Sequence, residues 1–231
     1  MEKIDRRRRY IAVVDTETAN NLEDALVYDC GWAIVDKRGT VYLTRSFVNR
    51  DIFVYHRDLM KTAYYAEKVP LYVKELREGK RKMADWDTIC KIFHSDCAKF
   101  GVTACCAHNA RFDLNALNTS QRYITKSKRR YFFPYGVEIW DTMKMAEDVI
   151  ATMPTFQTWA KNNGYVTKTG RVQIKAEVLY RFISNNNDFV ESHTGLEDVL
   201  IEKEILAYCF KKHKAMRKSP FEKKKKKGLT K

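Results

Sequence analysis

The apolar positions near the start of the chain form three short runs that are rich in β-branched and aromatic residues. The first run covers Tyr10 to Asp15, and two more lie within residues 25–48, on either side of a Lys-Arg-Gly break at residues 37–39. Short runs of this composition are typical of strands, and a glycine-containing break between two of them is typical of a hairpin. The pattern therefore predicts three antiparallel strands, the first of them buried.

From residue 58 onwards the spacing of apolar positions changes to that of helices with short strands between them. In residues 85–100 the apolar side chains recur three and four positions apart, as on one face of a helix. Further strands are predicted at residues 102–109 and 137–140, and further helices at residues 111–125, 141–150, 171–183 and 195–216. This order predicts an α/β fold with a mixed sheet of about five strands, an antiparallel hairpin plus parallel strands, and helices on both faces. In such open sheets ligands bind outside the strand ends.

Length and composition are those of a single globular domain. The chain has 231 residues, of which 45% are hydrophobic and 31% are charged, and a domain of roughly 200 residues is the simplest expectation for this length. The longest apolar runs are too short to span a bilayer, and no signal-peptide pattern follows the arginine-rich start. Six cysteines without a repeating spacing predict reduced thiols. We therefore expect a cytoplasmic protein.

Basic residues are concentrated in clusters, and the largest cluster lies in the last part of the sequence. The net charge is +14, and residues 217–231 carry eight basic residues and one Glu, a net of +7. Smaller clusters occupy residues 6–9, 74–82 and 122–133, the last interleaved with Tyr and Phe. This distribution favours a polyanionic partner such as nucleic acid. It predicts a basic extension, a folded domain and a flexible lysine-rich tail that is either an electrostatic tether or a solubilising terminus, at residues 1–9, 10–216 and 217–231.

Acidic side chains lie at the predicted ends of several elements. Asp15 and Glu17 are one residue apart at the end of the first strand, so their carboxylates point to the same side and repel each other. Such a pair indicates either a bound cation or a solvated strand end. Asp113 falls at a strand-to-helix corner, while His193 precedes the last helix and Asp198 lies in its first turn. Each of these alone has an ordinary explanation, as a helix-capping acid or a surface histidine, but together they form a candidate catalytic set.

Three sequence motifs contain these residues: VVDTET, AHNARFD and HTGLED. They resemble the three ordered motifs of the DEDD exonuclease superfamily in its DEDDh branch, which includes polymerase proofreading subunits, ribonuclease T and oligoribonuclease. The order, the spacing and the elements that carry the motifs agree with the family pattern, and WDTMKMA resembles a further family segment after the fifth strand. The resemblance extends from about Ile11 to Tyr208. It implies a ribonuclease H-like fold, with an exonuclease domain at residues 10–216.

The resemblance also implies a 3′→5′ exonuclease that uses two Mg²⁺ ions, for which Mn²⁺ can substitute. Asp15 would bridge the two ions, and Glu17 and Asp198 would hold the ion that activates water. Asp113 would support the second ion. Hard divalent cations prefer such oxygen ligands, and a pair of ions activates the nucleophile and stabilises the leaving oxygen. His193 would be the general base, because an imidazole with a pKa near ~6.5 accepts a proton at neutral pH.

The same resemblance assigns a contact with the terminal nucleotide to Thr18 and the residues just after it, and places Asn109 in the lining of the pocket. Near Asn20 the family usually has an apolar residue that contacts bases, whereas this chain has the polar sequence ANNL. We expect single-stranded or frayed 3′ ends as the substrate. DNA is favoured over RNA, although no sequence motif reports the contact to a 2′-hydroxyl that would decide between them.

Two other functions remain as hypotheses: an exoribonuclease that acts on short or structured RNA, and a non-catalytic module that binds nucleic acid or a polymerase. A polymerase or replication partner and a homodimer are further partner hypotheses. The presence of all five motif residues favours the enzyme, since a binding module gains nothing from four clustered carboxylates. A zinc site at Cys90, His94 and Cys97 is disfavoured, because structural zinc needs four ligands and the same helical face holds Phe93 and Phe100.

Overall fold

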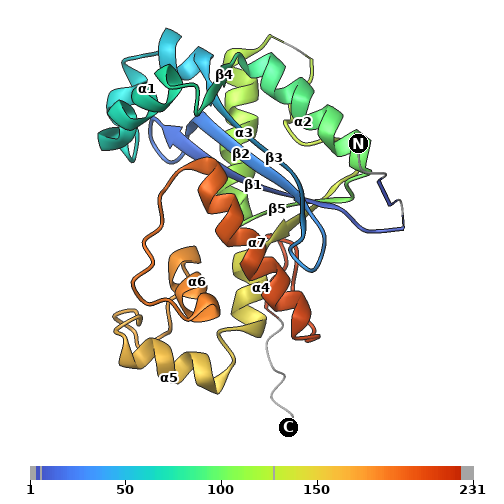
Figure 1. Cartoon of the computed structure of the whole chain (residues 1–231), viewed down its shortest axis with the longest axis vertical. Coiled ribbons are helices and arrows are strands. Elements are labelled where there is room, and N and C mark those ends of the chain that lie inside the picture. The colour runs from blue at the N-terminus through green and yellow to red at the C-terminus, as the bar shows by residue number, and fades with distance from the viewer. Residues whose placement is uncertain (1–3, 6, 127, 225–231) are drawn as a thin grey trace.

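A six-stranded mixed sheet forms the centre of the protein (Figure 1). The computed structural model describes residues 4–5, 7–126 and 128–224. The strands are β1 (Ile11–Ala19), β2 (Leu26–Val35), β3 (Val41–Asn49), β4 (Lys82–Ala84), β5 (Ala104–Ala107) and β6 (Glu138–Asp141). Their order in the sheet is β4-β3-β2-β1-β5-β6. β1, β2 and β3 pair antiparallel, whereas β5 and β6 run parallel to β1, and β4 runs parallel to β3.

This arrangement confirms the predicted fold class, a mixed α/β sheet of ribonuclease H-like type with an antiparallel hairpin and parallel strands. The sheet has one strand more than expected, because β4 was not predicted. Its three residues, KMA, are too short to give a strand-like apolar run. β4 forms only through its pairing with the end of β3, where Phe47 lies opposite Lys82.

Helices cover both faces of the sheet, as expected (Figure 1). α2 and α3 pack on one face, and α4, α6 and α7 pack on the other. No helix of the described residues is long and apolar enough to cross a bilayer. The helices are α1 (Val69–Arg77), α2 (Trp86–Phe100), α3 (Ala110–Ile124), α4 (Thr142–Val149), α5 (Pro154–Asn162), α6 (Ala176–Ser184) and α7 (Gly195–Lys211), with the short turns η1 (Asp51–Tyr55), η2 (Leu59–Thr62) and η3 (Ala66–Lys68).

β1 is buried on both faces, and its side chains alternate between two cores. Val14 belongs to the core that β1 shares with α2 and α3, whereas Val13 belongs to the core that it shares with α7. The residues that continue the second set along the strand are Asp15 and Glu17, since side chains two apart point to the same face. The alternation of β1 therefore directs both carboxylates to the α7 side of the sheet.

The cysteines are part of the hydrophobic interior. All six are buried free thiols. Cys90 and Cys97 lie on the face of α2 that packs into the core together with Phe93, and the Nε2 atom of His94 lies 2.6 Å from the carbonyl oxygen of Phe132. The predicted core role of this helix face is confirmed.

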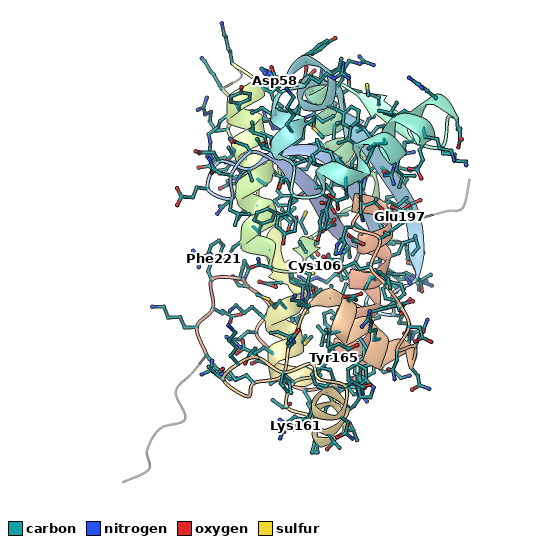
Figure 2. The ribbon with its side chains drawn as sticks, turned by 90° about the vertical axis from the view of Figure 1, so that its left-hand side faces the viewer. Asp58, Cys106, Lys161, Tyr165, Glu197 and Phe221 are labelled. Carbon is teal, nitrogen blue, oxygen red and sulfur yellow. The ribbon has the colours of Figure 1, made fainter. Side chains whose placement is uncertain are left out.

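The chain after α7 remains in contact with the folded domain as far as it is described. The Arg217 guanidinium pairs with Asp148 at 2.9 Å, and the Lys218 carbonyl accepts the backbone N–H of Asp141 at 2.7 Å. Phe221, labelled in Figure 2, lies beside Arg111 at the start of α3. The predicted flexible tail covers residues 217–231. Its described part, residues 217–224, makes these contacts, and residues 225–231 lie outside the described part of the chain.

Candidate active site

A cavity of about 880 Å³ opens at the end of β1. It is formed where the carboxyl ends of β1 and β5 meet the starts of α3 and α7. The residues that sequence analysis selected all line this one cavity: Asp15, Glu17, Thr18, Asn109, Asp113, His193 and Asp198. Segments from the start, the middle and the last third of the sequence thus converge on one place.

Two glycines allow α7 to begin directly on the sheet. Gly31 on β2 lies opposite Asp15 in the antiparallel register. A Cβ atom on Gly31 would lie 2.4 Å from the carbonyl carbon of Gly195, the first residue of α7, and a Cβ atom on Gly195 would lie 2.9 Å from the Gly31 nitrogen. Only glycine permits such close backbone contact. This contact brings Asp198, in the first turn of α7, up to the carboxylates of β1.

Three carboxylates form the centre of the site. Ligand oxygens of Asp15, Glu17 and Asp198 all lie within 4.8 Å of one another. Burial, with added repulsion from the neighbouring acids, raises the pKa of Asp15 well above its usual value and raises the pKa of Glu17 to about 9. For Asp198, burial and then Glu191 raise the pKa to about 8. Each group resists ionisation while no cation is near.

These three carboxylates fit a hard divalent cation. The Oδ1 atom of Asp198 is buried and has no hydrogen-bond partner in the described part of the chain. A buried oxygen left unpaired in this way is costly, and a cation that ligates it removes the cost. An all-oxygen donor set of clustered carboxylates is the set that Mg²⁺ or Mn²⁺ prefers.

Asp113 faces the same cavity but does not belong to the three-carboxylate cluster. Its Oδ1 atom accepts the hydroxyl of Thr16 at 2.8 Å, and its side chain is buried. Burial raises the pKa of Asp113 to about 7. Thr16 points to the opposite side of β1 from Asp15, so this hydrogen bond holds the start of α3 against the strand. The fourth acid is therefore positioned separately from the other three.

Asn109 forms the corner between β5 and α3. Its backbone is left-handed, with φ of 66°, a conformation that asparagine adopts more readily than most residues. Its N–H donates to the Oδ1 atom of Asp141, which also caps the start of α4. Asp141 belongs to the WDT segment, so this segment holds the corner that carries Asn109 and Asp113.

His193 lies in the loop that precedes α7. Its ring stacks on Tyr65 with centroids 4.3 Å apart, and its Nδ1 atom lies 3.8 Å from the Oε2 atom of Glu191. Burial and the nearby Lys68 ammonium lower the pKa of His193 below its usual value. The imidazole is therefore neutral at pH 7 and has a lone pair available to accept a proton.

Three acidic residues of the cavity were not found by sequence analysis: Glu177, Glu191 and Glu202. Glu191 forms a second group of neighbouring ligand atoms with His193 and Asp198, again within 4.8 Å. Glu202 is buried on α7, four positions after Asp198. Its sequence signal was this spacing, which places both acids on one helix face, but an acid in a long helix normally faces solvent.

A buried ion pair anchors the start of α7. Asp29 on β2 is fully buried; it accepts the Tyr72 hydroxyl at 2.6 Å and the Gly195 N–H at 3.1 Å, and it pairs with Arg81 at 3.2 Å. Arg81 directly precedes β4, the strand that was not predicted. The edge of the sheet therefore helps to fix the helix that carries Asp198.

The stability of the metal-free protein is expected to fall as pH rises from about 5 to 9. A carboxyl group whose pKa is higher in the folded than in the unfolded protein prefers to be protonated in the folded state. Its contribution to stability is complete below the pKa of the unfolded chain, which is about 4. The contribution is lost as pH rises through the pKa of the folded protein. For Asp113, Asp198 and Glu17 those folded values are about 7, 8 and 9. Thermal unfolding in EDTA and in saturating Ca²⁺ measures the effect. Ca²⁺ should raise Tm most at pH 9, and a Tm in EDTA that climbs with pH would contradict the assignment.

Comparisons with known proteins identify a fold but no family. No protein-family model matches the chain, and no curated protein matches it either. Among solved structures, Escherichia coli Exonuclease I in complex with a dA16 oligonucleotide superposes with a TM-score of 0.53 at 12% identity, covering 89% of this chain and 42% of that one. The zinc-bound complex of the same enzyme with single-stranded DNA gives a TM-score of 0.52 at 13% identity, covering 85% and 39%.

The likeness concerns the arrangement of the elements. At 12–13% identity it establishes a shared fold. The present chain spans about two fifths of the length of these Exonuclease I structures. It corresponds to one part of a larger protein, and the activity of the whole protein does not transfer with the fold.

Proposed function

We propose that this chain is a metal-dependent 3′→5′ exonuclease that hydrolyses phosphodiester bonds at nucleic-acid 3′ ends. The observation that carries the proposal is the cluster of Asp15, Glu17 and Asp198, with ligand oxygens within 4.8 Å of one another, in an open cavity beside a neutral histidine. The Exonuclease I fold supports it, because that fold is found with DNA oligonucleotides in the matched structures.

The chain's own residues would have separate tasks. Asp15, Glu17 and Asp198 would hold divalent cations, Mg²⁺ or in its place Mn²⁺, and Asp113 would support them. The cations would neutralise charge on the phosphate and lower the pKa of water. His193 would accept the proton of the attacking water at its free ring nitrogen, for which its lowered pKa is suitable.

Exposed apolar side chains line part of the cavity. Asn20, which stands near the position where the DEDDh family has an apolar residue, donates instead to the Asp24 carbonyl at 3.0 Å. Leu22 lines the cavity with 74% of its surface exposed, and Tyr64 does the same with 74% exposed. We infer that these two side chains contact the terminal bases, while Thr18 and Asn109 contact the sugar and phosphate. Base contacts of this kind suit unpaired strands, and single-stranded DNA is the favoured substrate.

The proposal is tested by digesting 3′-labelled and 5′-labelled oligonucleotides, of DNA and of RNA, single- and double-stranded. We expect nucleoside 5′-monophosphates to be released stepwise from 3′ ends in Mg²⁺, fastest from single-stranded DNA, and no release in EDTA. Faster digestion of RNA would change the substrate to RNA. Full activity in EDTA, or equal cleavage of a circular strand, would overturn the proposal.

Truncation after Lys224 is expected to weaken substrate binding without changing the chemistry. Residues 225–231 contain four lysines. If about three of them neutralise phosphates on a single strand, their removal lowers the salt exponent of binding by about 2, worth roughly 20-fold in affinity between ~50 and ~200 mM salt. KM should rise at low salt and become less dependent on salt, while kcat at saturating substrate stays unchanged. Kinetics across a salt series measure both constants.

Truncation after Met216 is the matched comparison. It also removes Arg217, which pairs with Glu147 and Asp148, so it should lower Tm in addition. If KM depends on salt in the same way for the full chain and for the protein truncated after Lys224, the tether is excluded and a solubilising role is left.

A further inference from the structure

Glu202 is a further carboxylate of the candidate active site and lies outside the three sequence motifs. Only 3% of its surface is exposed, and it lines the same cavity as Asp15 and Asp113. It follows Asp198 by four positions on α7, so both side chains emerge from one face of the helix. Glutamate is almost never fully buried unless it is paired, so its partner has to be identified.

The described residues leave one oxygen of Glu202 without a partner. The backbone N–H of His108, just after β5, favours its ionised form and so acts to lower the pKa. The Oε2 atom is buried and has no hydrogen-bond partner in the part of the chain that the structure describes. The ionisable groups that act most strongly on it are all acidic: Asp113, Asp198 and Glu191. A buried carboxylate with an unpaired oxygen and acidic neighbours is strongly disfavoured unless a cation is bound.

Glu202 is an electrostatic neighbour of Asp15 and Asp113. Its charge raises the pKa of Asp15 more than that of any other ionisable group does, and the charge of Asp113 does the same to the pKa of Glu202. All three side chains line the same cavity. Asp113 is the acid that the three-carboxylate cluster leaves out.

We propose that Glu202 is a direct ligand of a second divalent cation, which it binds together with Asp15 and Asp113. Its unpaired Oε2 atom supplies the ligand oxygen. Two divalent cations would neutralise most of the charge of Asp15, Glu17, Asp113, Asp198 and Glu202, whereas a single cation would leave a large negative charge in the cavity. The inference rests on the metal-dependent site of the proposed function and makes no assumption about the substrate.

The competing explanation is that Glu202 is a protonated acid with a purely structural role. Glutamine has the same shape as protonated glutamate and carries no charge, so Glu202→Gln would then leave cation binding unchanged. If Glu202 is a ligand, the same change removes the negative charge from the second cation position. The two explanations predict different cation binding for one variant.

The experiment is calorimetric titration of the metal-free full chain with Ca²⁺, for the native protein, Glu202→Gln and a control. We expect two binding steps for the native protein. In Glu202→Gln one step should be kept and the other weakened by at least about 10-fold, the lower end of what loss of a supporting contact costs a metal site. The control is Glu204→Gln, two positions along α7, whose side chain is 41% exposed and pairs with Lys203. It should keep both steps.

Unfolding experiments separate loss of a ligand from loss of the fold. In EDTA, Glu202→Gln should have a Tm at or above that of the native protein, because it removes a buried carboxyl group that is costly to ionise. If the variant is less stable instead, a crystal of the native protein grown with Ca²⁺ decides. An ion at about 2.3–2.6 Å from the Glu202 carboxylate supports the proposal, and ions bound away from Glu202 overturn it.

Two native-like Ca²⁺ steps in a folded Glu202→Gln would likewise overturn the proposal and leave Glu202 as a structural acid. Failure of the proposed function has a different signature. In that case the native protein would bind two cations through Glu202 and yet release no nucleotide from any oligonucleotide.

Discussion

Replacement of Asp15 by Asn is expected to abolish nuclease activity, with kcat/KM lowered by at least about 10⁴-fold. Asp15 belongs to the three-carboxylate cluster with Glu17 and Asp198. It is also a ligand of the proposed second cation, together with Asp113 and Glu202. Its loss removes a ligand from both cation positions at once. When several residues act as a unit, losing one of them can lower the rate nearly as much as losing all of them. Initial rates on 3′-labelled single-stranded DNA, together with the Ca²⁺ titration, measure the change.

His193→Ala is the matched comparison for Asp15→Asn. It leaves all the carboxylates in place, so cation binding should persist and the loss should be that of a general base, roughly 10²- to 10⁴-fold. In EDTA, Asp15→Asn should unfold at a higher temperature than the native protein, since burial and repulsion disfavour the native carboxylate. The roles would be wrongly assigned if Asp15→Asn kept substantial activity while higher pH restored no activity to His193→Ala.

Replacement of Gly31 by Ala is expected to displace the start of α7 and to cost both stability and activity. The added Cβ would lie 2.4 Å from the carbonyl carbon of Gly195 and 2.5 Å from its oxygen. Backbone atoms cannot rotate away as a side chain can, so helix and sheet must separate. Overpacking of this kind typically costs ~1–3 kcal/mol. Displacement of Asp198 by ~1 Å lowers the rate by roughly 10²-fold.

Gly101→Ala is the control for the effect of replacing a glycine. Gly101 ends α2 with a left-handed φ of +65°, and no atom lies within 4 Å of an added Cβ. Its replacement should lower Tm through backbone strain but leave the rate per folded molecule unchanged. Chemical denaturation and activity at full folding separate the two contributions. A Gly31→Ala protein with normal cation binding and normal rate would show that α7 does not need this close contact.

The parts of the fold that sequence analysis anticipated are those encoded locally. The apolar run of β1, the KRG turn and the helical spacing of α2 are each defined by residues that are close together in sequence. Each of these elements formed as expected. The motif residues line one cavity because each lies at the end of its own element, and strand ends meet at one edge of a sheet.

The features that were not anticipated depend on contacts between distant segments. β4 has no signal of its own and exists through its pairing with β3. Gly31 stands in the middle of a strand, where glycine is locally unfavourable, and its role appears only when α7 lies against it. Glu202 looks like an ordinary helical acid until the packing of α7 buries it. Arg217 was assigned to a flexible tail because nothing near it in sequence indicates Asp148 as its partner.

The contact between Gly31 and Gly195 also determines when, during synthesis, the protein can become active. Asp15 and Asp198 are 183 residues apart in the sequence, so Asp198 and the helix that carries it are translated well after β1. Until α7 packs on the sheet, the cluster lacks Asp198 and the cavity lacks one wall. We therefore expect a nascent chain to be unable to degrade nucleic acid until α7 has been made and has packed on the sheet. If RNA is among its substrates, the message that encodes it would be protected up to that point.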